Sequence, residues 1–434
     1  MSIGTIETAP PRELVDVEAS PSPPASLNPW VPRLVLLAAV IGALAYRWTM
    51  RDVVTGDYRM FLQNWYQHLA SAGGLAGLAD ASFSNYNTPY LALLALLTYV
   101  PSVPPLYGVK AISVVFDLVL AYFGYRIVAL LRPASTWAPV AAAAALLFLP
   151  TLAMNSSAWA QCDSIYAAFC LGSLYYLLRD RPWAAMALFG VAFAFKLQAV
   201  FLLPALVGIL IVNRQRLRSF TSLFAAPAAF LAMLVPALIA GRSILSQLSV
   251  YPAQMADSSA ANVGARGGSS ASASLTANAP TVYAWLGGGD TVKYVGLGVA
   301  AAVTLAFGGW LLWRRRPLSG VQALALAATS TLIIPFLLPQ MHERYFYLAE
   351  VLLVLVACVQ PWFAVPAVLI QVASTGTYLS YLRGSNVWPL TVSAGFAAAA
   401  SLCAGVLLVW MCRPAPVTNP EPSPPDFAGD SRLC

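Results

Sequence analysis

Long apolar runs separated by short polar turns dominate the sequence from about residue 30 onward. A membrane-spanning helix needs roughly 20 mostly apolar residues, and the chain has about twelve such runs. They are continuous and rich in Ala and Leu, whereas membrane β-strands would be short and alternating. The pattern predicts an all-α polytopic membrane protein with spans near residues 31–49, 109–131, 137–154, 163–178, 182–196, 198–212, 220–240, 293–313, 319–338, 345–361, 364–382 and 390–412.

The run at residues 89–100 is too short to cross a bilayer and is followed by Pro101, so it predicts an interfacial or re-entrant helix. With this threading and a cytoplasmic N-terminus, the dense basic clusters of the short turns all fall inside, as the positive-inside rule requires. These clusters contain Arg132, Arg179, Arg181, Arg214, Arg216, Arg218, Arg314, Arg315, Arg316 and Arg413. If 89–100 did span, every later cluster would lie outside. We therefore expect a multi-pass protein of the plasma (inner) membrane with both termini cytoplasmic.

Composition agrees with a membrane protein: 59% of residues are hydrophobic and 9% are charged. The net charge of +7 lies in turns between apolar runs, so it does not indicate nucleic-acid binding. The six cysteines show no paired spacing and are expected to be free thiols. Both Pro-rich ends, 1–29 and 414–434, are expected to be disordered cytoplasmic tails without a cleavable signal peptide. Residues 30–413 form one membrane domain with long outer loops at 50–108 and 241–292.

The few polar residues at the ends of apolar runs all come out on the outer face in this threading. They are Asp57, Asn85, Asn87, Lys110, Asp163, Lys196, His342, Glu343 and Arg344. Scattered structural polar groups would not sort to one face, whereas the residues of a membrane-embedded active site would. The loop segment 256–289, rich in Ser, Ala and Gly, is expected to be mobile and to act as a lid.

Asp57 is the candidate general base, because a carboxylate at the rim of a partly dry cavity can accept a proton. The alternative is a helix N-cap, a common position for Asp. Gln161 and Asp163 open the span at 163–178, where Gln161 could bind a substrate hydroxyl and Asp163 could be a cap. Asn85, Asn87 and Tyr90 are hydroxyl-binding residue types, although without further context a polar turn before Pro89 is the favoured explanation of this segment.

Cations are expected to converge on the outer face from Lys110, from Lys196 beside Gln198, and from Arg344. A phosphate is the natural ligand of such a group, and lysine snorkelling to the interface is the alternative. His342-Glu343-Arg344 is the densest polar cluster, and such groups between two spans are costly unless they are used or paired. A zinc site is not indicated, since His68 is the only other histidine.

Two acids, Asp117 and Glu350, lie deeper in the predicted spans. Intramembrane acids are candidates for function. Pairing with Lys196 or Arg344, which would hold the site in shape, is the alternative.

The ordered set of these motifs resembles the bacterial relatives of the glycosylphosphatidylinositol mannosyltransferase II family. The motifs are Gly56-Asp57, Asn85-Tyr86-Asn87-Thr88-Pro89-Tyr90, Lys110 with Asp117, Gln161-Cys162-Asp163-Ser164, Phe195-Lys196-Leu197-Gln198 and His342-Glu343-Arg344-Tyr345. That family belongs to the GT-C class of polyprenyl-phosphate-sugar-dependent glycosyltransferases, and the resemblance covers about residues 31–412. Two positions depart from the family pattern, in which Asn-Tyr-Pro-Pro is usual at Asn85 and Gly-Gln-x-Asp is usual at Ala160.

The resemblance implies a GT-C fold and an inverting hexosyltransferase, with mannose expected and Asp57 as the base. A polyprenyl-phosphate sugar would be the donor, and a lipid, glycan or protein the acceptor on the extracytoplasmic face. Asn85, Asn87, Tyr90, Lys110, Gln161, Asp163, Lys196, Gln198, His342, Glu343 and Arg344 would bind substrate. No cofactor is expected, and a divalent metal is not required. The alternative functions are a secondary transporter, which would place its ionisable groups near the midplane, and a flippase of lipid-linked sugars.

Overall fold

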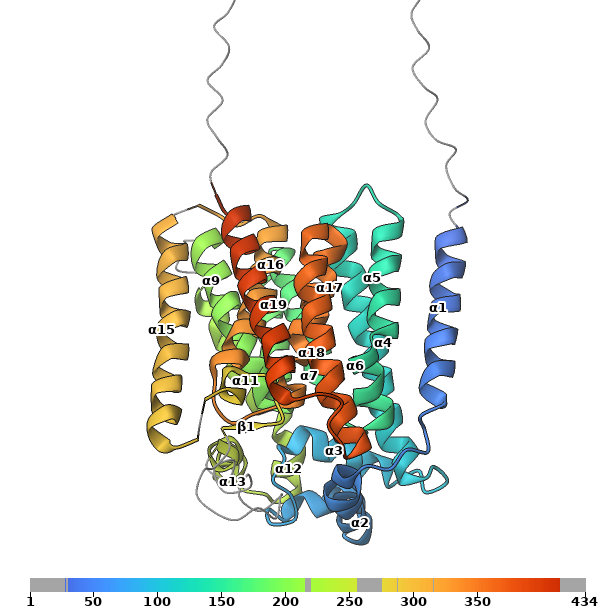
Figure 1. Cartoon of the computed structure of the whole chain (residues 1–434). Coiled ribbons are helices and arrows are strands. Elements are labelled where there is room, and N and C mark those ends of the chain that lie inside the picture. Colours follow the sequence, from blue (N-terminus) through green and yellow to red (C-terminus); the bar gives the residue numbers. More distant parts are fainter. Residues whose placement is uncertain are drawn as a thin grey trace, which may run out of the picture.

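The computed structural model describes residues 28, 30–214, 220–255, 275–286, 288–314 and 316–413. Long helices stand side by side in a bundle, and short helices cover one end of it (Figure 1). The helices and strands are α1 (Trp30–Trp48), α2 (Gln63–Ser71), α3 (Thr88–Leu97), α4 (Pro105–Leu131), α5 (Trp137–Phe148), α6 (Pro150–Ala153), α7 (Asp163–Leu178), α8 (Pro182–Phe195), α9 (Leu203–Arg214), α11 (Ala225–Met233), α12 (Val235–Ala240), α13 (Ile244–Leu248), β1 (Thr276–Ala277), α15 (Asp290–Arg314), α16 (Gly320–Leu337), β2 (Met341–His342), α17 (Tyr347–Val359), α18 (Ala364–Arg383) and α19 (Leu390–Met411).

The all-α prediction is confirmed, and each of the twelve predicted spans is occupied by helix. Seven of the described helices are long and apolar enough to cross a membrane, or eight if the bent pair of Trp137–Phe148 and Pro150–Ala158 is one span. The count of about twelve is therefore not reached by length. The spans predicted at 163–178, 182–196 and 198–212 form shorter apolar helices, and α17 has 13 residues.

The bent pair meets at 48° where Leu149 is followed by Pro150. Proline has no N–H to continue the helical hydrogen bonds, so the chain turns there. The second half, Pro150–Ala158, is made of α6 and the π-helical turn η3 (Met154–Ala158), and Trp159 directly follows it. This bend brings two side chains, those of Trp159 and Gln161, toward the candidate base.

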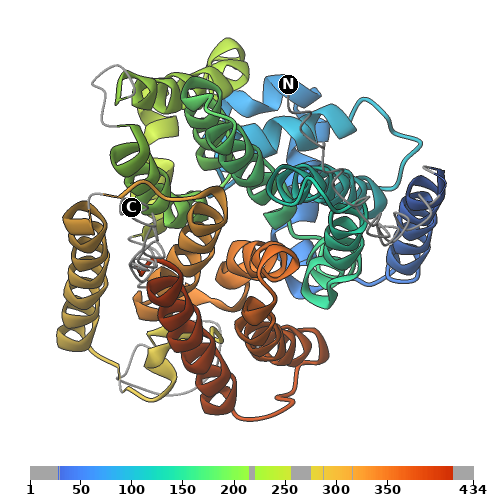
Figure 2. The same ribbon diagram turned by 90° about the horizontal axis from the view of Figure 1, so that it is seen from above.

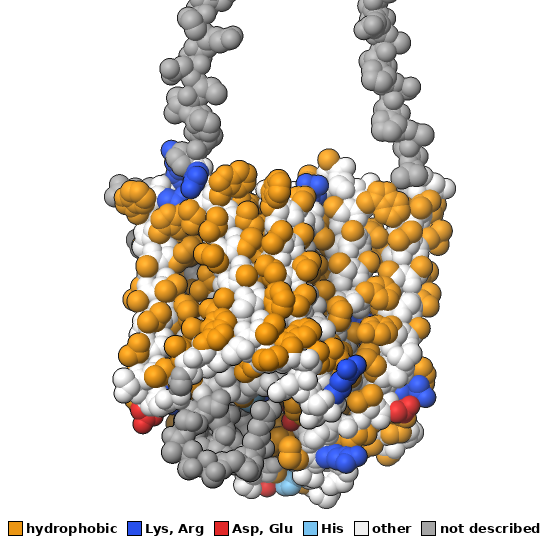
Figure 3. Space-filling model, viewed as in Figure 1, with side chains coloured by type: hydrophobic (Ala, Val, Ile, Leu, Met, Phe, Trp, Pro, Cys, Tyr) orange, Lys and Arg blue, Asp and Glu red, His pale blue; other side chains and the backbone are white. Residues whose placement is uncertain are grey.

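The bundle core is closely packed by α4, α5, α7, α8, α16 and α17, and α1 and α15 lie at opposite edges in the view along the bundle (Figure 2). On the face shown in Figure 3, hydrophobic side chains cover the sides of the bundle, and charged side chains gather near its two ends. Transfer of this apolar surface from water into lipid is favourable. The protein is thus an all-α polytopic membrane protein.

The end of the bundle that holds α2 and α3 is built from the chain between residues 55 and 104 and from segments after α11. Asn87 caps α3 by accepting from the Thr88 N–H at 3.1 Å, and Pro89 follows in the first turn, as the sequence predicts. At ten residues, α3 is too short to span. β1 pairs in parallel with β2, in the register Thr276↔Met341, so the chain before α15 is joined to the His342 segment.

Candidate active site

A cavity of about 960 Å³ opens at this end of the bundle. Six segments line it, and they lie far apart in the sequence: 53–65, 85–90, 160–162, 276–278, 342–344 and 381–384. Seven of the twelve predicted site residues line it, namely Asp57, Asn85, Tyr90, Gln161, His342, Glu343 and Arg344. The structure therefore brings together part of the polar set that the threading placed on one face, including Asp57, His342 and Arg344.

Asp57 does not act as a helix cap. It precedes the π-helical turn η1 (Tyr58–Leu62), but its side chain makes no capping hydrogen bond. Its Oδ2 atom instead accepts from Trp159 Nε1 and from Gln161 Nε2, both at 2.9 Å. Oδ1 carries neither of these bonds. The N-cap alternative is thereby excluded, and a partly exposed carboxylate faces the cavity.

Ala160 gives the backbone the shape that both donors require. Its φ is +64°, in the left-handed region that favours glycine. Trp159 and Gln161, on either side of it, reach the same carboxylate oxygen. Asn278, which also lines the cavity, has a φ of +58°. Strained backbone of this kind persists where surrounding structure imposes it, commonly at functional sites.

Trp159 lies between the candidate base Asp57 and the cation Arg344. Its indole is fully buried and stacks on Tyr381, with ring centroids 3.9 Å apart. The Arg344 guanidinium lies over the same indole, 5.4 Å from the ring centroid. Trp159 was not among the predicted site residues. No sequence pattern signals an indole N–H that points at a carboxylate about 100 residues earlier.

Among the described residues, Arg344 is the cation that lies within 4 Å of Asp57. Its Nη1 lies 3.7 Å from Asp57 Oδ2 and 3.5 Å from Glu343 Oε1. Its Nε has no hydrogen-bond partner among the described residues, so the guanidinium keeps donor capacity for a ligand. An anionic group entering the cavity would meet this side chain.

Burial changes the pKa values of the two neighbours of Arg344 in opposite directions. Burial raises the pKa of the Glu343 carboxyl to about 7, so that carboxyl changes charge near neutral pH. Burial, with the nearby Arg344 charge, lowers the pKa of His342 to about 3. His342 is therefore a neutral imidazole at physiological pH. It can exchange hydrogen bonds with a substrate but adds no positive charge.

Lys196 and Asp163 form a buried ion pair instead of facing the cavity. Lys196 Nζ bonds Asp163 Oδ1 at 2.5 Å, and Asn155 Nδ2 donates to Asp163 Oδ2 at 2.8 Å. Neither ion lines the cavity, although Cys162 beside Asp163 does. The expectation that Lys196 clamps a phosphate is corrected on this geometry, because a buried ammonium stays with the carboxylate that neutralises it. Asp163 likewise serves as this partner and makes no cap.

Lys110, Asn87 and Gln198 also lie away from the cavity, contrary to prediction. Lys110 Nζ donates to the carbonyls of Met50, Arg51 and Val53 at 2.8–2.9 Å, so its three N–H groups are used to fix the chain after α1. Asn87 caps α3 and donates to the Ala194 carbonyl. Gln198 is buried, and its Oε1 has no partner among the described residues.

The two deep acids are structural, with partners other than those expected. Asp117 pairs with Arg47 of α1 at 2.8 Å and accepts from Ser156 at 2.7 Å. Glu350 accepts from Thr151 and Gln371. The pairing of these acids with Lys196 or Arg344 is therefore wrong. A buried charge needs a partner, but which partner depends on how the helices pack.

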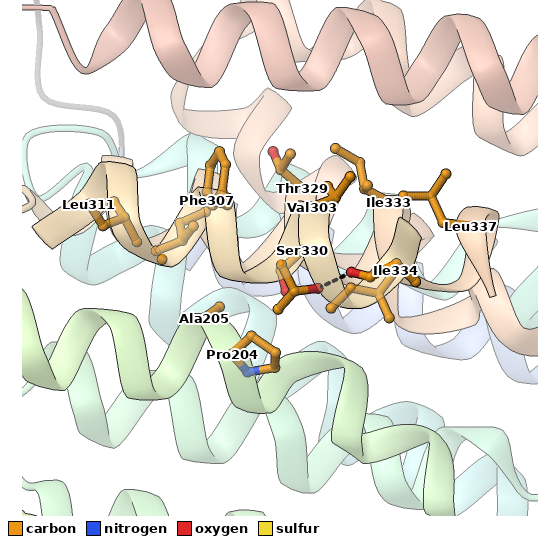
Figure 4. A pocket seen from close by; sticks show the side chains of 14 residues that line it. Pro204, Ala205, Val303, Phe307, Leu311, Thr329, Ser330, Ile333, Ile334 and Leu337 are labelled. Carbon is orange, nitrogen blue, oxygen red and sulfur yellow. Dashed lines mark hydrogen bonds between the residues drawn. The ribbon is translucent and has the colours of Figure 1, made fainter. Parts of the chain in front are cut away.

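A second hollow, of about 60 Å³, lies between α9, α15 and α16 (Figure 4). Apolar side chains such as Phe307, Ile333 and Leu337 line most of it, and its polar groups are the hydroxyls of Thr304, Thr329 and Ser330. It contains no titratable side chain, so acid–base chemistry belongs to the larger cavity. Among the described residues, no group of three His, Cys, Asp or Glu is placed to hold a metal ion. The predicted lid falls mostly on residues 256–274, outside the described ranges.

Comparison with known proteins gives a family match over more than half of the chain. Residues 83–339 match the model of glycosyltransferase family 87. The matched segment contains Gln161 but neither Asp57 nor His342-Glu343-Arg344, which the fold brings beside it. The narrower resemblance to the glycosylphosphatidylinositol mannosyltransferase II family is not confirmed. A search of curated proteins finds no match.

Among solved structures, the chain is similar to that of ArnT from Cupriavidus metallidurans bound to undecaprenyl phosphate. The sequences are 15% identical, and the TM-score is 0.48. The alignment covers 87% of this chain and 77% of that one.

Proposed function

The chain belongs to glycosyltransferase family 87 and is a membrane glycosyltransferase, and we propose that it takes a hexose, namely mannose, from a polyprenyl-phosphate sugar. The acceptor is a hydroxyl of a lipid, glycan or protein on the extracytoplasmic face. One observation carries the proposal: a carboxylate and a guanidinium lie 3.7 Å apart in a cavity at the end of a membrane bundle. Such a pair can accept a proton and stabilise a departing phosphate.

The reaction is a displacement at the anomeric carbon. The acceptor oxygen forms a bond to that carbon while the bond from the carbon to the phosphate oxygen breaks, and the configuration inverts. The acceptor proton passes to Asp57 Oδ1, the oxygen that Trp159 and Gln161 leave unoccupied. The leaving group is the polyprenyl phosphate, whose oxygen takes the electron pair of the broken bond, so the phosphate changes from a singly charged diester to a doubly charged monoester.

In this proposal two arginines bind the phosphate, in place of the lysines that the sequence suggested. Arg344 lies in the cavity wall, and Arg383, at the end of α18, also lines the cavity. Within the described residues Arg383 forms no ion pair. Guanidinium groups suit phosphate oxygens because they offer paired N–H donors in one plane.

Sugar hydroxyls have several partners on the remaining wall. Asn85 and the neutral His342 line the cavity, and so does Tyr90, whose buried hydroxyl has no partner among the described residues. Hydrogen bonds from such groups fix the orientation in which the anomeric carbon faces the base. No metal ion is needed in this scheme, since the two arginines balance the phosphate charge.

Trp159→Phe should lower kcat about tenfold while leaving the donor KM within about twofold, because one charge-assisted hydrogen bond to the base is lost. Tyr378→Phe is the matched control: Tyr378 packs edge-on against Trp159 but does not bond Asp57. A kcat of Trp159→Phe equal to that of wild type, or a loss confined to the donor KM, would remove Trp159 from this positioning role.

Donor binding should weaken as the pH rises through about 7. Below this value Glu343 is neutral, and above it the Glu343 carboxylate, 3.5 Å from Arg344, competes with the phosphate. The donor KM of wild type should therefore rise several-fold across neutrality, and Glu343→Gln should keep a low, flat KM. Steady-state kinetics at a series of pH values test this. A Glu343→Gln profile that still rises would assign the effect to another group.

Transfer by the purified protein tests the proposed function. Radiolabelled polyprenyl-phosphate mannose is supplied with a membrane lipid extract, and glucose and arabinose donors run in parallel. Label in a new lipid or glycan product from the mannose donor supports the proposal. Product from another donor alone would retain the enzyme class and reject mannose. Donor movement across vesicles without product would favour a flippase.

A further inference from the structure

Two arginines meet at the end of the bundle opposite the cavity. Arg126 lies in α4 and Arg179 directly follows α7, and both helices run away from the cavity end (Figure 1). Arg126 Nη1 donates to Tyr122 Oη and its Nη2 to Tyr175 Oη, both at 2.6 Å. Arg179 Nη1 donates to the same Tyr175 oxygen at 3.2 Å. We call these four side chains the Tyr–Arg cluster.

The Tyr–Arg cluster places two positive charges close together. Both guanidinium groups donate to the same phenol oxygen, Tyr175 Oη, at 2.6 and 3.2 Å, so the two donor nitrogens lie close to each other. No Asp or Glu among the described residues forms an ion pair with either arginine. The adjacent Asp180 has an interaction of its own. Two like charges at this separation repel, and an anion between them would remove that cost.

The cluster also has free donor capacity and an open side. An arginine carries five N–H donors, of which Arg126 uses two and Arg179 one within the described residues. Both arginines lie near helix C-termini, where the helix dipole favours cations. In the described part of the chain, their side-chain hydrogen bonds go to tyrosine oxygens and not to helix carbonyls. Both arginines lie over Tyr175, and Tyr122 is 51% exposed on the bundle side. The rings therefore orient the two guanidinium groups for a ligand that arrives along the membrane.

Depth in the bilayer identifies the ligand. Arg126 precedes the last residue of α4, Leu131, by five positions, which is about 7.5 Å along the helix axis. Arg179 lies at the helix end itself. The axial range between Arg126 and the helix end matches the depth of lipid phosphates, at the boundary between headgroups and acyl chains, where tyrosine is also enriched. We propose that the Tyr–Arg cluster binds the phosphate of an anionic phospholipid such as phosphatidylglycerol, at a site separate from the active site.

The test is lipid retention by the full chain. Protein reconstituted in phosphatidylglycerol and phosphatidylcholine is extracted, and bound lipids are counted by native mass spectrometry and by the lipid-dependent rise in the thermal unfolding midpoint. Wild type should retain phosphatidylglycerol over phosphatidylcholine. The double variant Arg126→Gln/Arg179→Gln should bind phosphatidylglycerol about tenfold more weakly, because the phosphate loses its charge-assisted partners.

Two further variants distinguish loss of the lipid site from a general loss of positive charge and from a failure to fold. Arg132→Gln is the matched control: Arg132 lies at the same end of α4 but donates to the Val359 carbonyl. Arg179→Gln alone, at an exposed position, is the variant to use if the double variant does not fold. Equal retention of both lipids by wild type, or unchanged retention by the variants, would overturn the proposal. Glycerol phosphate competing as strongly as the lipid would assign the site to a soluble phosphate instead.

Discussion

Asp57→Asn should lower kcat for sugar transfer by about 10²- to 10⁴-fold, the range over which a general base contributes. An amide of the same shape cannot take the acceptor proton. It can still accept the hydrogen bond from Trp159, so the local fold should persist. The Arg344 side of the cavity is unchanged, and the donor affinity should stay within a few-fold of wild type. Transfer kinetics and equilibrium donor binding together measure both effects.

The matched control for this loss is Asp52→Asn. Asp52 is an exposed acid five residues before Asp57 that pairs with Arg51 at 3.2 Å and accepts from Tyr107. It does not line the cavity. Its replacement should leave kcat within about twofold, since surface ion pairs contribute little. Near-normal transfer by a folded Asp57→Asn protein would exclude Asp57 as the base.

Arg344→Gln should lower kcat/KM by about 10²- to 10³-fold, because it removes the cation that meets both the bound and the departing phosphate. The loss should appear in both donor affinity and kcat. Arg344→Lys should recover part of the donor affinity and less of kcat. A lysine restores a point charge but not the planar group that lies over Trp159.

Arg59→Gln is the control for a loss of charge at the same face. Arg59 is exposed on η1 and does not line the cavity. Its replacement should change donor affinity only through weak, salt-dependent attraction. If Arg344→Gln and Arg59→Gln weaken donor binding equally, the effect is one of overall charge, and Arg344 has no specific place on the phosphate.

The helices could be predicted from the sequence because each apolar run must close its own backbone hydrogen bonds in lipid. The short helix before Pro101 and its N-terminal proline followed from run length and residue type. The number of full spans did not follow. Length in sequence does not show where a helix bends, as at Pro150, or where a short helix such as α7 lies buried among longer ones.

The candidate site could be located but not assembled from the sequence. Polar residues at the ends of apolar runs had to lie at the ends of helices, and Asp57, Gln161 and Arg344 do so together. Their partners depend on packing angles and on one left-handed residue, Ala160, which no pattern reveals. For the same reason, the sequence suggests a phosphate as the partner of both Lys196 and Lys110, whereas Lys196 pairs with Asp163 and Lys110 donates to three backbone carbonyls.

The most direct test of the account is a structure of the Asp57→Asn protein with a polyprenyl-phosphate sugar bound, solved in lipid nanodiscs. We expect the donor phosphate within hydrogen-bond distance of Arg344, with the sugar in the cavity between Asn85, Gln161 and residue 57. A donor held elsewhere, for instance with its phosphate against α9 and α15 and the cavity unchanged, would contradict the assignment of this cavity as the active site.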